Sequence, residues 1–190
     1  MRKIVLVFLI SLFLTPLFAK GSIFISDEKT FGIFPSFYYV EHGWFLGPVA
    51  QLTTIANNIA FSLGGRIGWM GNRRYVVGLG YYSQLTKIEI QTNKTVMNYG
   101  GLELEYIFFP DELIHFSVYS LLGYGGLKCG KYDHFFIVEP GVHAVLSMTD
   151  IFHIEFGLSK RFVKGVESDF VDFSDLNNYS WRAGFKLGNL

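Results

Sequence analysis

The stretch MNYGGLELEYIFF, residues 97–109, places Glu103 and Glu105 two positions apart inside an otherwise apolar and aromatic run. On a helix, residues two apart point to different sides, whereas on a strand they point to the same side. As a strand, the stretch puts both carboxylates on one face and Leu104 and Tyr106 on the other. The alternation therefore predicts a β-strand with one polar face and one apolar face.

The 190-residue chain is half hydrophobic, 18% aromatic and neutral overall, with 16 basic and 16 acidic residues. This length fits a single domain, and the neutral balance offers no basic stripe for nucleic acid. After residue 20, no segment reaches the roughly 18 uncharged apolar residues that a membrane-spanning helix needs. Short alternating strands that close into a barrel are the remaining way for such a chain to cross a membrane.

Residues 1–19 have a basic start, an apolar middle and a small residue, Ala19, at the end. This pattern predicts a secretory signal peptide cleaved near Ala19, with an uncleaved membrane anchor as the alternative. We expect residues 20–42 to be a periplasmic or rim-lying lead-in, because Pro35 interrupts its strand-like pattern and bacterial barrels use even strand numbers. Residues 43–190 are then the barrel.

Eight segments alternate between apolar and polar residues, which predicts an all-β, eight-stranded antiparallel up-and-down transmembrane barrel. They cover residues 44–55, 59–70, 75–86, 97–109, 114–128, 135–148, 151–162 and 178–188. A soluble β-sandwich or lipocalin-like barrel is the alternative, and it would put the apolar face inside. Aromatic residues near the strand ends predict girdles at both membrane surfaces: Trp44, Trp69, Tyr75, Phe108, Phe109, Tyr124, Phe135, Phe162, Tyr179 and Trp181.

The predicted connections alternate in length. Short ones lie at 72–74, 110–112 and 149–150, longer ones at 87–96, 129–134 and 163–177, and the 56–58 turn is a short exception. This alternation is typical of outer-membrane barrels, with both termini at the short, periplasmic end.

If the apolar face meets lipid, the polar face lines the lumen. The alternation then assigns one set of charged and histidine side chains to the lumen: Arg66, Glu103, Glu105, Glu139, His143, Glu155, Arg161, Arg182 and Lys186. His115, His153, Gln51 and Gln84 share this face. A narrow barrel has little lumen beyond its side chains, so four acids and four permanent bases should pair.

The predicted register suggests which groups pair. It places Arg66 near Gly80, Gly80 near Glu103, Gly78 near Glu105, Glu139 near Arg161, and both His143 and Lys186 near Glu155. We therefore expect a paired network and a closed or weakly conducting lumen. The alternative is that these groups only fill and polarise the interior.

The stretches GGLELEYIFFPDELIHFSVYSLLGYGG, FFIVEPGVHAVLSMTDIF and KRFVKGV resemble those of small outer-membrane β-barrel proteins of unknown function, over about residues 43–188. The resemblance implies an OmpX-like eight-stranded architecture, a bacterial outer-membrane location and insertion by the barrel-assembly machinery, but no activity. The chain departs from it at the end FKLGNL, because such barrels commonly finish on an aromatic residue.

Three functions stay open. The first is a structural or surface-interaction role, and the second is a narrow channel or conduit for a small or apolar ligand. The third is a lipid A-modifying enzyme, which would need Ser, His and a carboxylate near the outer leaflet. We expect no enzyme, because His115 and His153 lie near the predicted periplasmic turns and Ser120, on the lipid face, has no predicted His beside it.

No pattern predicts catalytic, cofactor-binding or metal-binding residues, since Asp133 and His134 are only two residues in a predicted loop. The expected partners are outer-membrane lipid, the assembly machinery and an extracellular partner for the acidic 163–177 loop. Lys160 falls on the predicted lipid face, where we expect it to snorkel to the outer surface.

Overall fold

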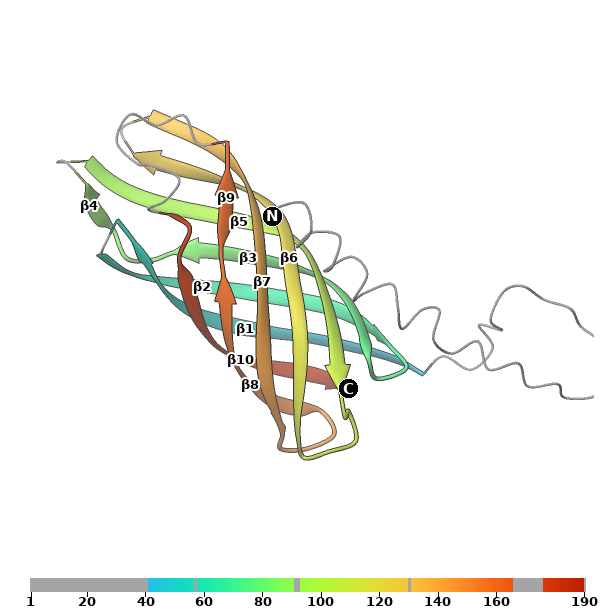
Figure 1. Cartoon of the computed structure of the whole chain (residues 1–190). Helices are drawn as coiled ribbons and strands as arrows, with labels where there is room; N and C mark the ends of the chain where they lie inside the picture. The colour runs from blue at the N-terminus through green and yellow to red at the C-terminus, as the bar shows by residue number, and fades with distance from the viewer. Residues whose placement is uncertain (1–40, 57, 91–92, 130, 166–175, 190) are drawn as a thin grey trace, which may run out of the picture. The chain divides into compact units, whose positions relative to one another are not determined.

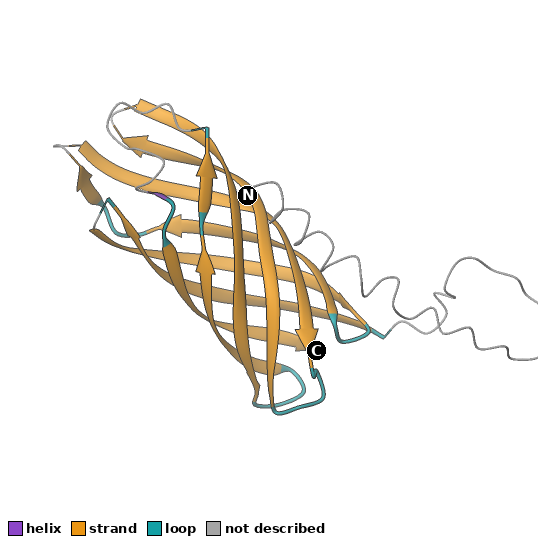
Figure 2. Ribbon diagram, viewed as in Figure 1, coloured by secondary structure: helices purple, strands orange, loops and turns teal. Residues whose placement is uncertain are grey.

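The computed structural model describes residues 41–56, 58–90, 93–129, 131–165 and 176–189. Within them, one sheet closes on itself into an antiparallel barrel (Figure 1, Figure 2). The strands are β1 (His42–Ile55), β2 (Asn58–Gly71), β3 (Tyr75–Gln84), β4 (Ile88–Ile90), β5 (Asn93–Phe108), β6 (Ile114–Cys129), β7 (Lys131–Ser147), β8 (Phe152–Lys160), β9 (Phe162–Lys164) and β10 (Tyr179–Asn189). No helix in the part of the chain that the structure describes is long and apolar enough to cross a membrane. The predicted signal peptide and residues 20–40 of the predicted lead-in lie outside the described residues.

Eight of these strands form the wall of the barrel. Strands that follow one another pair in order, and the pairings of β1 with β10 and of β3 with β5 close the ring. The two short strands extend this wall: β4 pairs with the start of β5, and β9 continues β8 beyond Arg161 and pairs with β7. The predicted eight-stranded up-and-down barrel is therefore confirmed.

The outer surface carries the apolar faces of the strands. In β1, burial alternates along the strand, so that Phe45 and Val49 are buried while Trp44 and Leu46 are 64% and 57% exposed. Phe156 on β8 is likewise exposed. A barrel in a bilayer needs a continuous apolar outer band, whereas a protein in water rarely exposes one. The soluble alternative, with its apolar face inside, does not fit this arrangement.

The two ends of the barrel differ. We call the turn end the one with the connections at 72–74, 109–113 and 148–151, where β1 begins and β10 ends side by side. At this end, Asn72 and Arg73 adopt φ angles of 51° and 55° in the tight connection from β2 to β3. We call the opposite end the loop end.

Two of the three predicted long connections at the loop end are short hairpins. Residues 88–90 pair with residues 93–95, and Cys129 pairs with Lys131. Strands β5, β6 and β7 consequently reach 16, 16 and 17 residues. The sequence prediction of longer connections was wrong because the outward residues of these extensions include Lys94 and His134, so the apolar alternation weakens before the strands end. The third predicted long connection, 163–177, lies mostly outside the described residues.

Candidate functional site in the barrel interior

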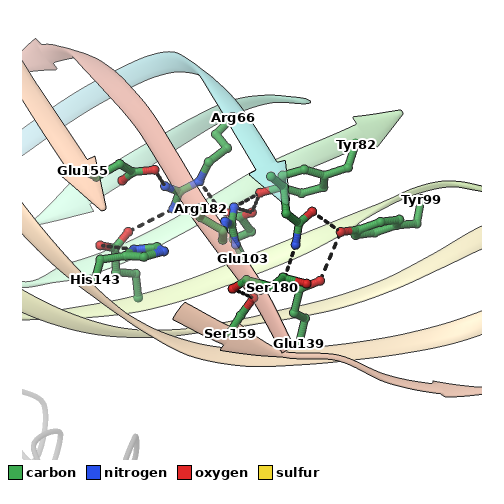
Figure 3. A network of polar contacts seen from close by, with 12 residues as sticks. Arg66, Tyr82, Tyr99, Glu103, Glu139, His143, Glu155, Ser159, Ser180 and Arg182 are labelled. Carbon is green, nitrogen blue, oxygen red and sulfur yellow. Dashed lines mark hydrogen bonds and ion pairs between the residues drawn. The ribbon is translucent and has the colours of Figure 1, made fainter. Parts of the chain in front are cut away.

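The interior holds every polar side chain that the sequence assigned to the lumen. The predicted charged and histidine residues are all buried in the described structure: Arg66, Glu103, Glu105, Glu139, His143, Glu155, Arg161, Arg182 and Lys186. His115, His153, Gln51 and Gln84 are buried as well. All but Arg161, which lies between β8 and β9, come from wall strands on which alternate side chains point inward. The charged side chains form a buried salt-bridge network, part of which Figure 3 shows.

Arg66 on β2 is the hub of this network. Its Nε donates to Glu103 at 2.5 Å, its Nη1 to Glu155 at 2.5 Å and its Nη2 to Glu105 at 3.1 Å. The planar guanidinium presents its donors in a fixed fork, so one cation can serve three carboxylates from two strands. This arrangement keeps three buried acids next to a positive charge.

Lys186 on β10 neutralises the same group from the other side. Its Nζ lies 2.9 and 3.0 Å from the two oxygens of Glu105 and 3.3 Å from Oε2 of Glu155. Ser117 donates to Glu105 at 2.6 Å. The Nδ1 atom of His143 is 3.7 Å from Glu105, which is too long for a hydrogen bond.

Arg182 on β10 is held between two tyrosine rings. Its guanidinium carbon lies 4.9 Å from the ring centre of Tyr82 and 4.5 Å from that of Tyr119. Arg182 also donates to the hydroxyl of Tyr82, which in turn donates to Glu103. Cation–π contact and hydrogen bonding together fix this arginine in the middle of the barrel.

Glu139 on β7 centres a second cluster. It accepts hydrogen bonds from Gln51 at 2.6 Å, Ser159 at 2.6 Å and Tyr99 at 3.1 Å. Arg161 lies 3.6 Å from the same carboxylate and donates to the hydroxyl of Tyr99 at 3.2 Å. The carboxylate is thus both hydrogen-bonded and paired with a cation, which a buried charge requires.

The predicted pairing was right for some groups and wrong for others. Arg66 lies opposite Gly80, as predicted, and pairs with the predicted carboxylates. Glu103, however, lies opposite Gly78 and Glu105 opposite Val76, two residues from the predicted partners. Moving the centre of a hairpin by one residue moves every partner by two, which keeps each side chain on its face.

The neighbours predicted for Glu155 differ in the same way. His143 lies opposite Gly157 and Lys186 opposite His153, each two residues from the predicted position. Lys186 nevertheless reaches Glu155 because its side chain is long. The contact between Glu139 and Arg161 forms as predicted.

Two apolar clusters enclose the charged interior, and the sequence analysis did not identify them. The first lies at the turn end and consists of Phe45, Met70, Val76 and Ile107. The second extends from the middle to the loop end and consists of Val49, Ile55, Ala60, Tyr82, Ile88, Met97, Tyr99, Leu121, Leu127, Cys129, Phe135, Ile137, Val163 and Leu176. Phe135 was predicted to belong to an outer girdle, but it is 1% exposed inside the barrel.

The same alternation that identified the charges could have identified these clusters and the three inner tyrosines. Tyr82 lies two residues from Gln84, and Tyr99 lies four residues from Glu103, so each shares an inward face. Tyr119 shares its face with His115 in the same way. The aromatic residues were missed because aromatic side chains were interpreted as the lipid-facing girdle.

At the turn end, a polar cavity of about 690 Å³ lies next to the first apolar cluster. Glu41, Asp111, Glu112 and Asp150 line it, and Met70 of the apolar cluster lines it too. No group of three or more His, Cys, Asp or Glu among the described residues is arranged to hold a metal ion. His134 lies away from this cavity, on the outer surface, where its ring stacks 5.4 Å from that of Tyr124.

A closed eight-stranded antiparallel barrel with an apolar outer band and a buried charged interior defines the class of outer-membrane β-barrels. Comparison with solved structures agrees. The barrel resembles Neisserial surface protein A (13% identity, TM-score 0.56, covering 77% of this chain and 96% of that chain). It also resembles the N-terminal barrel domain of OprF from Pseudomonas aeruginosa (14% identity, TM-score 0.56, covering 76% and 96%). These likenesses concern the fold, and no protein-family model and no curated protein matches the sequence.

Proposed function

We propose that the protein is a closed, non-conducting barrel of the bacterial outer membrane that serves a structural or surface-interaction role. The observation that carries this proposal is the stacking of the ion-pair network between two apolar clusters. A water-filled pore is lined by side chains that water can reach. In this interior, Arg66, Glu105 and Lys186 are at most 4% exposed.

The energetics of the network favour a closed state. Opening a path along the axis would have to separate Arg66 or Lys186 from their carboxylates, because these pairs extend across the interior. Removing one partner from a buried ion pair costs about 3–5 kcal/mol. Apolar residues on both sides of the network add a second barrier, since they offer an ion no ligands.

We infer that the turn end faces the periplasm and the loop end faces outward. Short turns and both ends of the chain face the periplasm in barrels of this class. The 163–177 segment is then a candidate contact for an extracellular partner, although residues 166–175 lie outside the described structure.

A scaffold role also fits better than lipid hydrolysis. The cross-strand neighbours of Ser120 are Leu104 and Pro140, neither of which can accept its proton. A nucleophilic serine needs an adjacent base. Incubation of the purified barrel with labelled lipid A should release no fatty acid, and release above that of a boiled sample would contradict this part of the proposal.

Conductance in planar bilayers tests the closed barrel. The folded protein should give no large, steady open state, whereas a porin reconstituted in the same bilayer supplies the positive control. Heat-dependent migration in SDS, compared before and after boiling, shows that the inserted sample is folded. A steady conductance from folded protein would instead support the narrow channel or ligand conduit.

A further inference from the structure

The outward faces of β8 and β9 change from apolar to basic near the loop end. Phe156 and Leu158 face outward in the apolar band, and Lys160, Phe162 and Lys164 continue the same face. The strand therefore places two lysines just beyond its apolar part. The two are four residues apart, or about 13 Å along a strand.

Lys160 is directed away from the middle of the bilayer. Its Nζ lies 4.9 Å from the ring centre of Tyr179, its cross-strand partner. The same atom lies 5.6 Å from the ring centre of Phe162, two residues nearer the loop end. The side chain therefore leans along the strand toward the membrane surface, as expected for a snorkelling lysine.

Further basic residues lie near the loop end on β6, β7 and β9. Lys164 lies opposite Phe136 on β7, and Lys128 on β6 lies opposite Tyr132 on the other side of β7. His134 is exposed between them. We call the outward-facing set Lys128, His134, Lys160 and Lys164 the basic rim.

The basic rim lacks acidic neighbours on its own face within the described residues of β6–β9. Glu139 and Glu155 point into the barrel, where they join the interior network. Asp133 lies on the inward-facing side of β7 with Phe135. An anion that reaches this outer surface would therefore meet positive charge beside aromatic rings.

We propose that the basic rim binds the phosphate groups of anionic lipid headgroups at the loop-end surface of the bilayer. A lipid whose chains lie against Phe156, Leu158 and Trp181 carries its phosphate at the height of the lysine ammonium groups. Phosphate complements these charges, and a basic residue close to an anionic lipid surface strengthens binding about fivefold. This inference goes beyond the proposed scaffold role and does not depend on whether the lumen conducts.

Tryptophan fluorescence can test the proposal because the chain has three tryptophans in useful places. Trp44 and Trp69 are register partners at the turn end, whereas Trp181 lies opposite Leu158, next to Lys160. The variant W44F/W69F keeps Trp181 as its single reporter. It is reconstituted in phosphatidylcholine vesicles that contain a small fraction of phosphatidic acid with brominated chains, which quench nearby tryptophan.

Quenching by brominated phosphatidic acid should exceed quenching by the same fraction of brominated phosphatidylcholine. Adding K160Q and K164Q should reduce this enrichment at least fivefold, whereas the matched control K87Q, on an exposed lysine in the connection between β3 and β4, should preserve it. An unchanged enrichment in the double-lysine variant, or an equal loss in K87Q, would overturn the proposal. Loss of the enrichment on adding inorganic phosphate would also overturn it, since the site would then take a soluble anion.

Native mass spectrometry provides a second readout that leaves the tryptophans in place. The detergent-extracted barrel should retain phosphatidic acid in preference to phosphatidylcholine, and the K160Q/K164Q variant should lose this preference. Equal retention by both proteins would contradict the proposal. Boiled and unboiled samples compared in SDS show that each variant is folded.

Discussion

Arg66 and Glu155 lie 89 residues apart in the chain, yet Nη1 of Arg66 is 2.5 Å from Oε1 of Glu155. Their strands, β2 and β8, are not neighbours: β1 and β10 separate them on one side of the ring, and β3, β5, β6 and β7 on the other. The contact therefore crosses the interior instead of following the wall. Because Arg66 also binds Glu103 and Glu105 on β5, one side chain ties three parts of the wall together.

Replacing Arg66 with methionine should destabilise the barrel by about 3–5 kcal/mol, because three buried carboxylates lose their shared cation. Arg66→Lys should have a smaller effect, since it keeps a charge but loses the fork that reaches all three. Denaturant unfolding of the barrel in detergent micelles measures both values. A loss below about 1 kcal/mol in the methionine variant would show that the network contributes little.

The pair formed by Arg73 and Asp111 at the turn end provides a contrast. The side chains are 43% and 77% exposed, and the atoms are 2.6 Å apart. Exposed ion pairs contribute about 0–1 kcal/mol and are screened by salt. Asp111→Asn should therefore change the unfolding free energy by less than about 1 kcal/mol, and the change should shrink further in high salt. A loss comparable to that of Arg66→Met would contradict this expectation.

Gly80 and Gly65, on paired strands, should respond in opposite ways to substitution. A Cβ at Gly80 would lie 2.5 Å from Oε1 of Glu103 and 3.0 Å from the ring of Tyr82, whereas a Cβ at Gly65 would meet nothing within 4 Å. Gly80→Val should destabilise the barrel by about 1–3 kcal/mol, as overpacking does. Gly65→Val should be neutral or stabilising, because valine favours strands. Equal unfolding midpoints for the two variants would rule out the predicted crowding.

The single cysteine reports on the loop-end apolar cluster. Cys129 is 1% exposed and packs inside the barrel. It should resist a water-soluble maleimide in the folded protein and react fully after boiling in SDS, which a gel shift measures. The variant Y132C/C129S is a matched control, because Tyr132 is exposed on the adjacent strand and should react without boiling. Rapid labelling of Cys129 in the folded barrel would mean that water reaches the loop-end interior.

The sequence was sufficient to assign faces, because alternation along a strand depends only on neighbouring residues. Glu103, Arg182 and the other inward charges follow from it directly. Contacts across the interior do not: Lys186 and Glu105 are 81 residues apart and belong to strands that are not neighbours. Such pairs depend on barrel diameter, strand tilt and side-chain reach, which alternation does not encode.

The sequence pattern also failed to predict where the strands end at the loop end. Lys94 and His134 are still in strands, although they fall in connections that the sequence analysis predicted, because an outward face near the loop end no longer needs to be apolar. The interior position of Phe135 was missed for a related reason, since an aromatic residue near the edge of the apolar band fits either face. Register errors of two residues arose because moving the centre of a hairpin by one residue moves every partner by two.

The pairing of β1 with β10 has a consequence for how the protein is made. Arg182 and Lys186 both belong to β10, the strand that pairs with β1 to close the ring. A sheet that lacks β10 would carry four interior carboxylates against only Arg66 and Arg161, an excess of two negative charges. Such an open sheet has to stay hydrated on its concave side until β1 and β10 pair. Expulsion of water and completion of the hydrogen-bonded ring are therefore expected to occur in the same late step of biogenesis.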